Sequence, residues 1–197
     1  MNQELVNYNK KVNQLIPTSL FGINSELCNE FFNILPELLE KSEIEDPEYE
    51  KMLYDTLELE GFEQIENINE YINFKSEKWG EEINQEILST LEITKYPDVS
   101  MLQNLLSLKN IDCVILSYWL HFLKNIHPIY DEKACEALKI MNLNVPFDSN
   151  DLTCYSKYVS VIEGLKQYAP AEALPEYALP RQRLLQLGLV EWLKQIN

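Results

Sequence analysis

The sequence predicts an all-α protein with a compact multi-helix core. Only 5 of the 197 residues are glycine, and leucine, glutamate, isoleucine, asparagine and lysine are abundant, which favours helices joined by short turns over strands. Hydrophobic residues make up 46% of the chain and aromatic residues 11%, which is enough to build a sizeable core. We therefore expect one domain, or one domain with a small subdomain.

The first two expected helices are bounded by prolines and by polar capping residues. One covers residues 3–16 and ends there because a proline follows. The next begins after Asn24 or Ser25, both of which are good N-caps. It runs toward Leu39, and Pro36 is expected to break or kink it.

Three more helices are expected in the acidic segment that follows. The first starts at Pro47, a favoured first helical position, and ends near Gly61. The other two cover residues 63–75 and 81–94, and the second of them carries apolar residues at helical spacing.

The chain becomes more apolar and much less acidic from Asp98, which marks the expected centre of the fold. The expected elements are a helix to about Leu106, a tight turn at Lys109 and Asn110, a helix over residues 112–124, an extended stretch over residues 126–130, and helices over residues 132–142, over residues 151–168 and from Pro180 onward. The final helix carries five leucines and a tryptophan and is expected to dock across the core.

Acidic residues are concentrated in the first half of the chain. The net charge is −16; residues 1–100 contain 22 acidic and 7 basic residues, whereas residues 101–197 contain 10 and 9. We expect an acidic helical subdomain over residues 1–96 and a core over residues 97–197, together forming one compact unit. This charge disfavours long duplex nucleic acid, and it leaves a nucleotide, a single-stranded nucleic acid or a basic protein as expected partners.

The four cysteines predict neither a disulfide framework nor a metal site. They are widely spaced, with no CxxC pair and no histidine at zinc-ligand spacing, so each is interpreted as a small buried hydrophobe. No cofactor is expected. The first residues lack the basic-then-apolar order of a signal peptide, and no apolar run reaches the roughly 18 residues of a membrane span. We therefore expect a cytoplasmic protein with no membrane partner.

A candidate hairpin, Leu-Lys-Asn-Ile-Asp, occupies residues 108–112, and about twenty residues later the phrase Pro-Ile-Tyr-Asp ends at Asp131. A helix that contains Leu-His-Phe-Leu-Lys lies between them. This order resembles the helix-hairpin-helix DNA glycosylase superfamily, in which a hairpin of roughly Leu-Pro-Gly-Ile-Gly precedes an invariant Asp. The resemblance covers residues 97–142, and residues 1–96 carry none.

The resemblance implies monofunctional hydrolysis of an N-glycosidic bond in a nucleic acid, nucleoside or nucleotide. Asp131 would stabilise the positive charge that develops on the sugar, and would orient or deprotonate a water. The base would enter a pocket walled by aromatic and imidazole rings. The candidates for this wall are Tyr118, Trp119, His121, His127 and Tyr130. Val114 or a neighbour stands where lyase members have a Schiff-base lysine, which implies hydrolysis alone.

Phosphate contacts would come from the hairpin and from the final helix. Lys109 and Asn110 lie in the hairpin, where Asn110 tolerates the left-handed backbone that the family's glycine adopts, whereas Asp112 would repel phosphate. Arg181 and Arg183, the two arginines of the chain, could bind phosphate bidentately. Surface or ion-pair roles are the simpler interpretation of these arginines.

Most of these residues also have a structural interpretation. An Asp at a helix start is commonly an N-cap, so Asp131 has this second interpretation. His121 lies between apolar residues, as a hydrogen-bonded core histidine does, and His127 lies in a loop. Tyr118 and Trp119 are adjacent on a helix, so at least one is expected in the core. The alternative function is therefore a noncatalytic all-helical protein-interaction module on the same scaffold.

Overall fold

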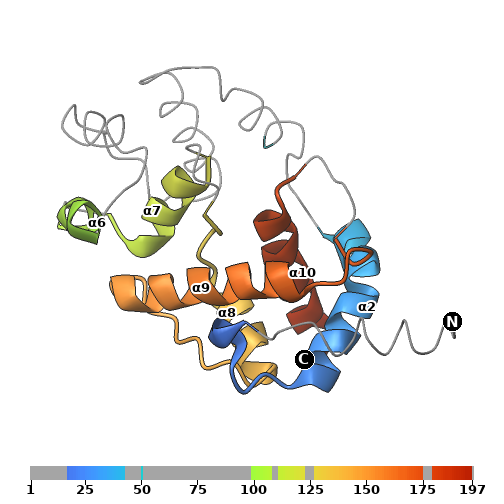
Figure 1. Cartoon of the computed structure of the whole chain (residues 1–197). Helices are drawn as coiled ribbons and strands as arrows, with labels where there is room; N and C mark the ends of the chain where they lie inside the picture. Colours follow the sequence, from blue (N-terminus) through green and yellow to red (C-terminus); the bar gives the residue numbers. More distant parts are fainter. Residues whose placement is uncertain are drawn as a thin grey trace, which may run out of the picture.

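The computed structural model describes residues 17–42, 50, 99–107, 111–122, 127–174 and 179–196, and all regular structure in these ranges is helical. Figure 1 shows how the helices are arranged. They are the 3-10 helix η1 (Thr18–Leu20) and the α-helices α2 (Ser25–Lys41), α6 (Val99–Leu106), α7 (Cys113–Leu120), α8 (Glu132–Ile140), α9 (Leu152–Tyr168) and α10 (Arg181–Ile196). The predicted all-α class is confirmed.

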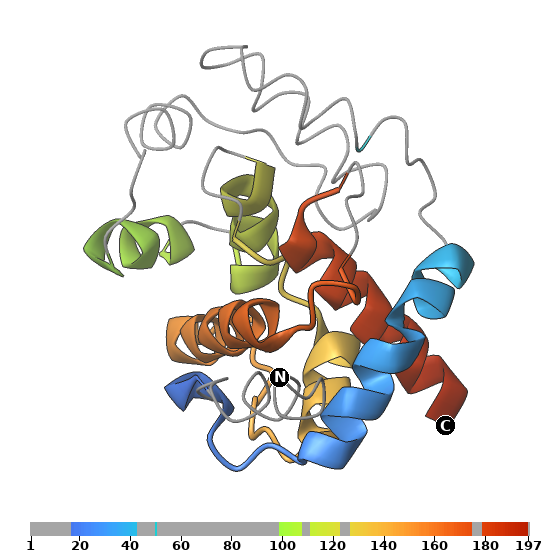
Figure 2. The same ribbon diagram turned by 45° about the vertical axis from the view of Figure 1, so that its right-hand side comes forward.

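Helix α10 lies at the centre of the described fold and contacts α8, α2 and α9 (Figures 1 and 2). Every residue from Arg183 to Leu189 is buried, and so are Trp192 and Leu193. Because buried residues surround almost the whole helix rather than one stripe, α10 packs against neighbours on several sides. The prediction that the final helix docks across the core is therefore confirmed.

Helix α2 crosses α10 and packs closely against it (Figure 2). The rings of Phe31 and Trp192 lie with their centroids 5.7 Å apart. One turn before Trp192, Gly188 lies against the same stretch of α2, and a Cβ at this position would overlap the Cδ1 atom of Leu35. The absence of a side chain at Gly188 thus sets the close approach of the two helices.

Helix α2 begins at the predicted cap but continues further than expected. Asn24 accepts hydrogen bonds from two backbone N–H groups of the first turn. Pro36 does not break the helix, which runs on without interruption to Lys41. Leu35 and Leu38 are fully buried on either side of the proline, and this burial outweighs the backbone hydrogen bond that proline cannot donate.

Helix α9 contacts η1 and α10. Gly164 allows the approach of η1, because a Cβ at this position would overlap Oγ of Ser19 and lie 3.1 Å from Leu20. Asp151 caps the helix by accepting a backbone hydrogen bond of 2.8 Å from its first turn. The predicted helix over residues 151–168 is confirmed to within one residue.

The short helix α7 and the segment after it lead from α6 to α8. Asp112 caps α7, and α6 packs against α7. Within α7, Ser117 Oγ accepts a hydrogen bond of 2.8 Å from the backbone N–H of Tyr130. This bond holds the non-helical residues 127–131 against α7, so the observed order of helix, irregular segment and helix agrees with the predicted one.

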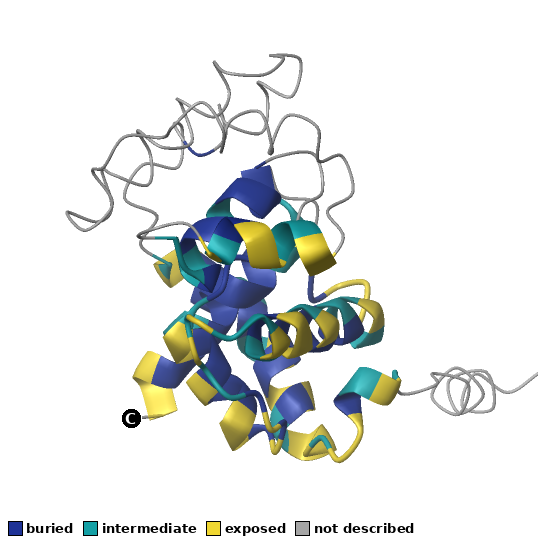
Figure 3. Ribbon diagram, turned by 90° about the vertical axis from the view of Figure 1, so that its left-hand side faces the viewer, coloured by how far each residue is buried: buried dark blue, intermediate teal, exposed yellow. Residues whose placement is uncertain are grey.

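Burial follows the contacts between helices: in Figure 3 the buried residues lie where helices face one another and the exposed ones on the outer faces. Within the described ranges, no helix combines the length and the apolar character needed to cross a membrane. Several predictions fall outside these ranges. They are the helices over residues 3–16, 63–75 and 81–94, the helix starting at Pro47, and the turn at Lys109 and Asn110.

Candidate functional site

Asp131, the predicted catalytic residue, is half-buried at the start of α8. Its Oδ1 atom accepts a hydrogen bond of 3.0 Å from the backbone N–H of Ala134, so the carboxylate caps the helix. Its Oδ2 atom accepts a hydrogen bond of 2.9 Å from Nε2 of Gln186 on α10. The carboxylate therefore joins the start of one helix to the middle of another.

Gln186 extends these hydrogen bonds into the core. Its Oε1 atom accepts a hydrogen bond from Nη1 of Arg183. The guanidinium of Arg183 donates from Nε and Nη2 to the two carboxylate oxygens of Glu50, at 2.7 and 3.0 Å. Glu50 is fully buried and Arg183 is 6% exposed, so this bidentate ion pair is shielded from water. We call Asp131, Gln186, Arg183 and Glu50 the polar network.

Tyr130, a predicted wall residue of the base pocket, lies in a packed aromatic cluster. It is 1% exposed, and its hydroxyl bonds to the backbone of the loop between α8 and α9. Ring centroids 4.7 to 5.3 Å away belong to Phe147, Tyr155 and Tyr158. The hydroxyl of Tyr158 is buried and has no hydrogen-bond partner in the described part of the chain. The role of Tyr130 in base binding stays a prediction.

Tyr118 and Trp119 differ in burial, as expected for adjacent helix positions. Trp119 is 3% exposed and belongs to the core, whereas Tyr118 is half-buried and packs against the edge of the core. The expectation that at least one of them lies in the core is confirmed. Their role as pocket walls, like that of Tyr130, stays a prediction.

His121 is a buried histidine with a defined tautomer. Its Nδ1 atom lies 2.6 Å from the backbone oxygen of His127, and because a carbonyl oxygen can only accept, Nδ1 carries the proton. Burial, followed by the nearby charge of Arg183, lowers the pKa of His121 to about 4, so the ring is neutral at pH 7. Burial also lowers the pKa of His127. The interpretation of His121 as a hydrogen-bonded core histidine is confirmed.

The buried imidazole is expected to make the protein less stable as the pH falls from about 6.5 to about 4. In this window an unfolded His121 takes up a proton that the folded site resists, so the unfolded state binds more protons and the free energy of unfolding decreases. His121→Asn keeps an N–H near the His127 carbonyl and does not titrate. Urea denaturation across this window is therefore expected to give a shallower pH dependence for His121→Asn than for the wild type. Equal pH dependence in the two proteins would contradict the assignment of this loss of stability to His121.

The described cysteines are weak nucleophiles. Burial raises the pKa of Cys28, Cys113 and Cys135 to about 12. Desolvation and a hydrogen bond to Asp151 raise the pKa of Cys154, which is half-buried. All four thiols are free, and in the part of the chain that the structure describes no three His, Cys, Asp or Glu side chains are grouped so as to hold a metal ion.

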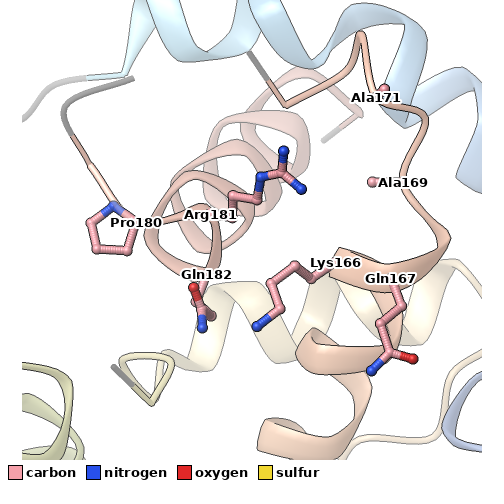
Figure 4. A pocket seen from close by; sticks show the side chains of 7 residues that line it. All are labelled: Lys166, Gln167, Ala169, Ala171, Pro180, Arg181 and Gln182. Atoms are coloured by element: carbon pink, nitrogen blue, oxygen red, sulfur yellow. The ribbon is translucent and has the colours of Figure 1, made fainter. Parts of the chain in front are cut away.

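A groove of about 830 Å³ lies between the end of α9 and the start of α10 (Figure 4). We call it the α9–α10 groove. It is lined by two cationic, two amide and three small apolar residues: Lys166, Arg181, Gln167, Gln182, Ala169, Ala171 and Pro180. The sequence indicated Arg181 as a phosphate ligand but gave no sign of the others, because a lysine or glutamine that lines a groove has the same local pattern as one on an open surface.

The arginines, predicted together as phosphate ligands, lie in different surroundings. Arg183 is held in the buried ion pair with Glu50, which is the alternative role that the sequence allowed. Arg181 is exposed at the mouth of the groove and forms no ion pair with any described residue. Lys109 and Asn110, the predicted hairpin contacts, lie outside the described residues.

No protein-family model, curated protein or solved structure matches the chain.

Proposed function

We propose that this protein is a noncatalytic helical binding protein, in which Asp131 joins helices α8 and α10. The observation that supports the proposal is the pair of hydrogen bonds to its carboxylate. One oxygen accepts from Ala134 and caps α8, and the other accepts from Gln186. A structural role explains both bonds without any movement of the protein.

Catalysis by Asp131 would require these bonds to be rearranged. A carboxylate that stabilises a sugar cation must face the sugar and a water. Turning Oδ2 away from Gln186 would leave a buried amide without its acceptor, at a cost of about 1–3 kcal/mol. Turning Oδ1 away from Ala134 would remove the N-cap of α8, which would destabilise the helix by about 1 kcal/mol. The geometry therefore favours the structural role.

The predicted base-binding rings support the same proposal. Tyr130, Trp119 and His121 are 1 to 3% exposed and pack against other core residues. Placing a base between them would require the core to open, which costs the free energy gained by burying these large side chains. Their present contacts are those of core residues.

A base-release assay tests the proposal. Wild type and Asp131→Asn are incubated with nucleosides, nucleotides and oligonucleotides that carry modified bases, and free base is quantified by chromatography. We expect no release above the buffer control from either protein. Asp131→Asn is expected to lower the free energy of unfolding by about 1 kcal/mol, because the Asn oxygen can still cap α8 while its amide opposes the amide of Gln186.

The opposite result would identify a glycosylase. Base release by the wild type that is lost in a folded Asp131→Asn would overturn the noncatalytic proposal and support the role that the family resemblance implies for Asp131. Circular dichroism of the variant establishes whether it is folded.

A further inference from the structure

We propose that the α9–α10 groove binds a small organic phosphate, with the guanidinium of Arg181 as its principal phosphate ligand. This inference deepens the proposed binding function and rests on it for its biological meaning. The observations that support it are the groove itself and the charge, exposure and partners of the side chains that line it.

Of the two cations that line the groove, Arg181 is the one without an ion-pair partner among the described residues. Within the described ranges it forms no ion pair, whereas Arg183 two residues later is fully engaged by Glu50. Figure 4 shows the Arg181 side chain reaching over the groove toward the segment that carries Ala169 and Ala171. A planar guanidinium in this position can donate two parallel hydrogen bonds to phosphate oxygens.

Lys166 supplies a second hydrogen-bond donor from the opposite helix. Its ammonium lies 2.5 Å from a carboxylate oxygen of Glu163, and Gln182 donates a hydrogen bond of 3.1 Å to the other oxygen. The ion pair with Glu163 offsets the charge of Lys166, whose ammonium keeps further N–H groups that can donate to a phosphate. Although the chain has twice as many acidic as basic residues, the described residues that line the groove include two cations and no acid.

The start of α10 adds to the positive potential of the groove. Arg181 and Gln182 occupy the first turn of this helix, where backbone N–H groups point outward and the helix dipole favours an anion. This contribution accompanies the side-chain cations and falls off within one turn.

The size and the apolar part of the lining indicate an organic group beside the phosphate. A volume of about 830 Å³ lies within the usual range for small-molecule sites, roughly 300–1,000 Å³. Ala169, Ala171 and Pro180 provide a small apolar wall, and the amide of Gln167 can bond to hydroxyl or ring atoms. Inorganic phosphate alone would leave most of this lining without contact.

Calorimetric titration with adenosine 5′-monophosphate tests the proposal, with inorganic phosphate as a competitor and adenosine as the ligand without phosphate. Arg181→Gln and Lys166→Gln each remove one groove cation. Lys194→Gln is the matched control, because it removes the same charge from the other end of α10, about 20 Å away. We expect saturable binding that weakens about tenfold or more in each groove variant, is unchanged in Lys194→Gln, and is reduced by inorganic phosphate. Adenosine is expected not to bind.

Two results would overturn the inference. One is the absence of saturable binding of both adenosine monophosphate and inorganic phosphate to the wild type. The other is equal weakening in Lys194→Gln and Arg181→Gln, which would mean that net charge rather than the groove determines binding. Chromatography of the same samples separates this inference from the proposed function. Binding together with adenine release would support phosphate binding in the groove and refute the noncatalytic proposal. Absence of both binding and release would refute only the proposal that the groove binds a phosphate.

Discussion

Replacing Arg183 with methionine is expected to lower the free energy of unfolding by about 3–5 kcal/mol. The substitution removes the guanidinium that holds the fully buried carboxylate of Glu50, and it takes the donor from Oε1 of Gln186. A buried charge that loses its partner costs much more than the pair itself contributes, since its lost hydration is no longer compensated. Urea denaturation followed by circular dichroism measures the change.

Arg181→Met is the matched control for this substitution. Arg181 lies two residues earlier on the same helix, is exposed, and forms no ion pair in the described ranges, so its replacement is expected to change stability by less than about 0.5 kcal/mol. Adding Glu50→Leu to Arg183→Met is expected to restore much of the loss, because both charges are then absent. Similar losses in Arg183→Met and Arg181→Met would refute the structural importance of the buried pair.

Replacing Gly188 with valine is expected to lower the free energy of unfolding by about 1–3 kcal/mol. Helix propensity alone predicts a slight gain, because glycine is the poorer helix former. The added side chain would instead overlap Leu35 and press on the ring of Phe31, which are both fully buried. The contact between α2 and α10 must then open, and thermal or urea unfolding would report the loss.

A second substitution in α2 tests whether the loss at Gly188 is steric. Leu35→Ala alone leaves a cavity and is expected to cost about 2–5 kcal/mol. Combined with Gly188→Val, it provides the space that the new side chain needs, so the double variant is expected to lose about 0.5–3 kcal/mol less than the sum of the single losses. Strict additivity would mean that the two positions do not compete for the same space.

The helices of the second half were predictable because their signals are local. Capping residues set their starts: Asp131 and Asp151 precede α8 and α9 within one residue of the predicted positions. Apolar spacing fixed the type of element and also the central place of α10, whose leucines and tryptophan are buried. The uninterrupted course of α2 through Pro36 was not predictable from local sequence, because the burial of Leu35 and Leu38 on either side of the proline depends on the tertiary fold.

The polar network was not predictable, because its contacts follow no sequence period. Glu50 and Arg183 lie 133 positions apart, and Gln186 and Asp131 lie 55 apart. Before folding, Glu50 is one of many glutamates in an acidic segment, and a glutamine carries no charge that would indicate a partner. Arg181 was predicted as a phosphate ligand from its residue type, whereas the groove around it depends on how α9 meets α10.

The order of the helices along the chain has a consequence for synthesis of the protein. Helix α10 follows every other described helix in the sequence, yet it contacts α2, α8 and α9 and carries Arg183, the partner of Glu50. While a ribosome is making the chain, the earlier helices therefore emerge with their α10-facing surfaces uncovered. We expect nascent chains that stop before residue 181 to remain sensitive to protease, and resistance to appear once α10 has left the exit tunnel.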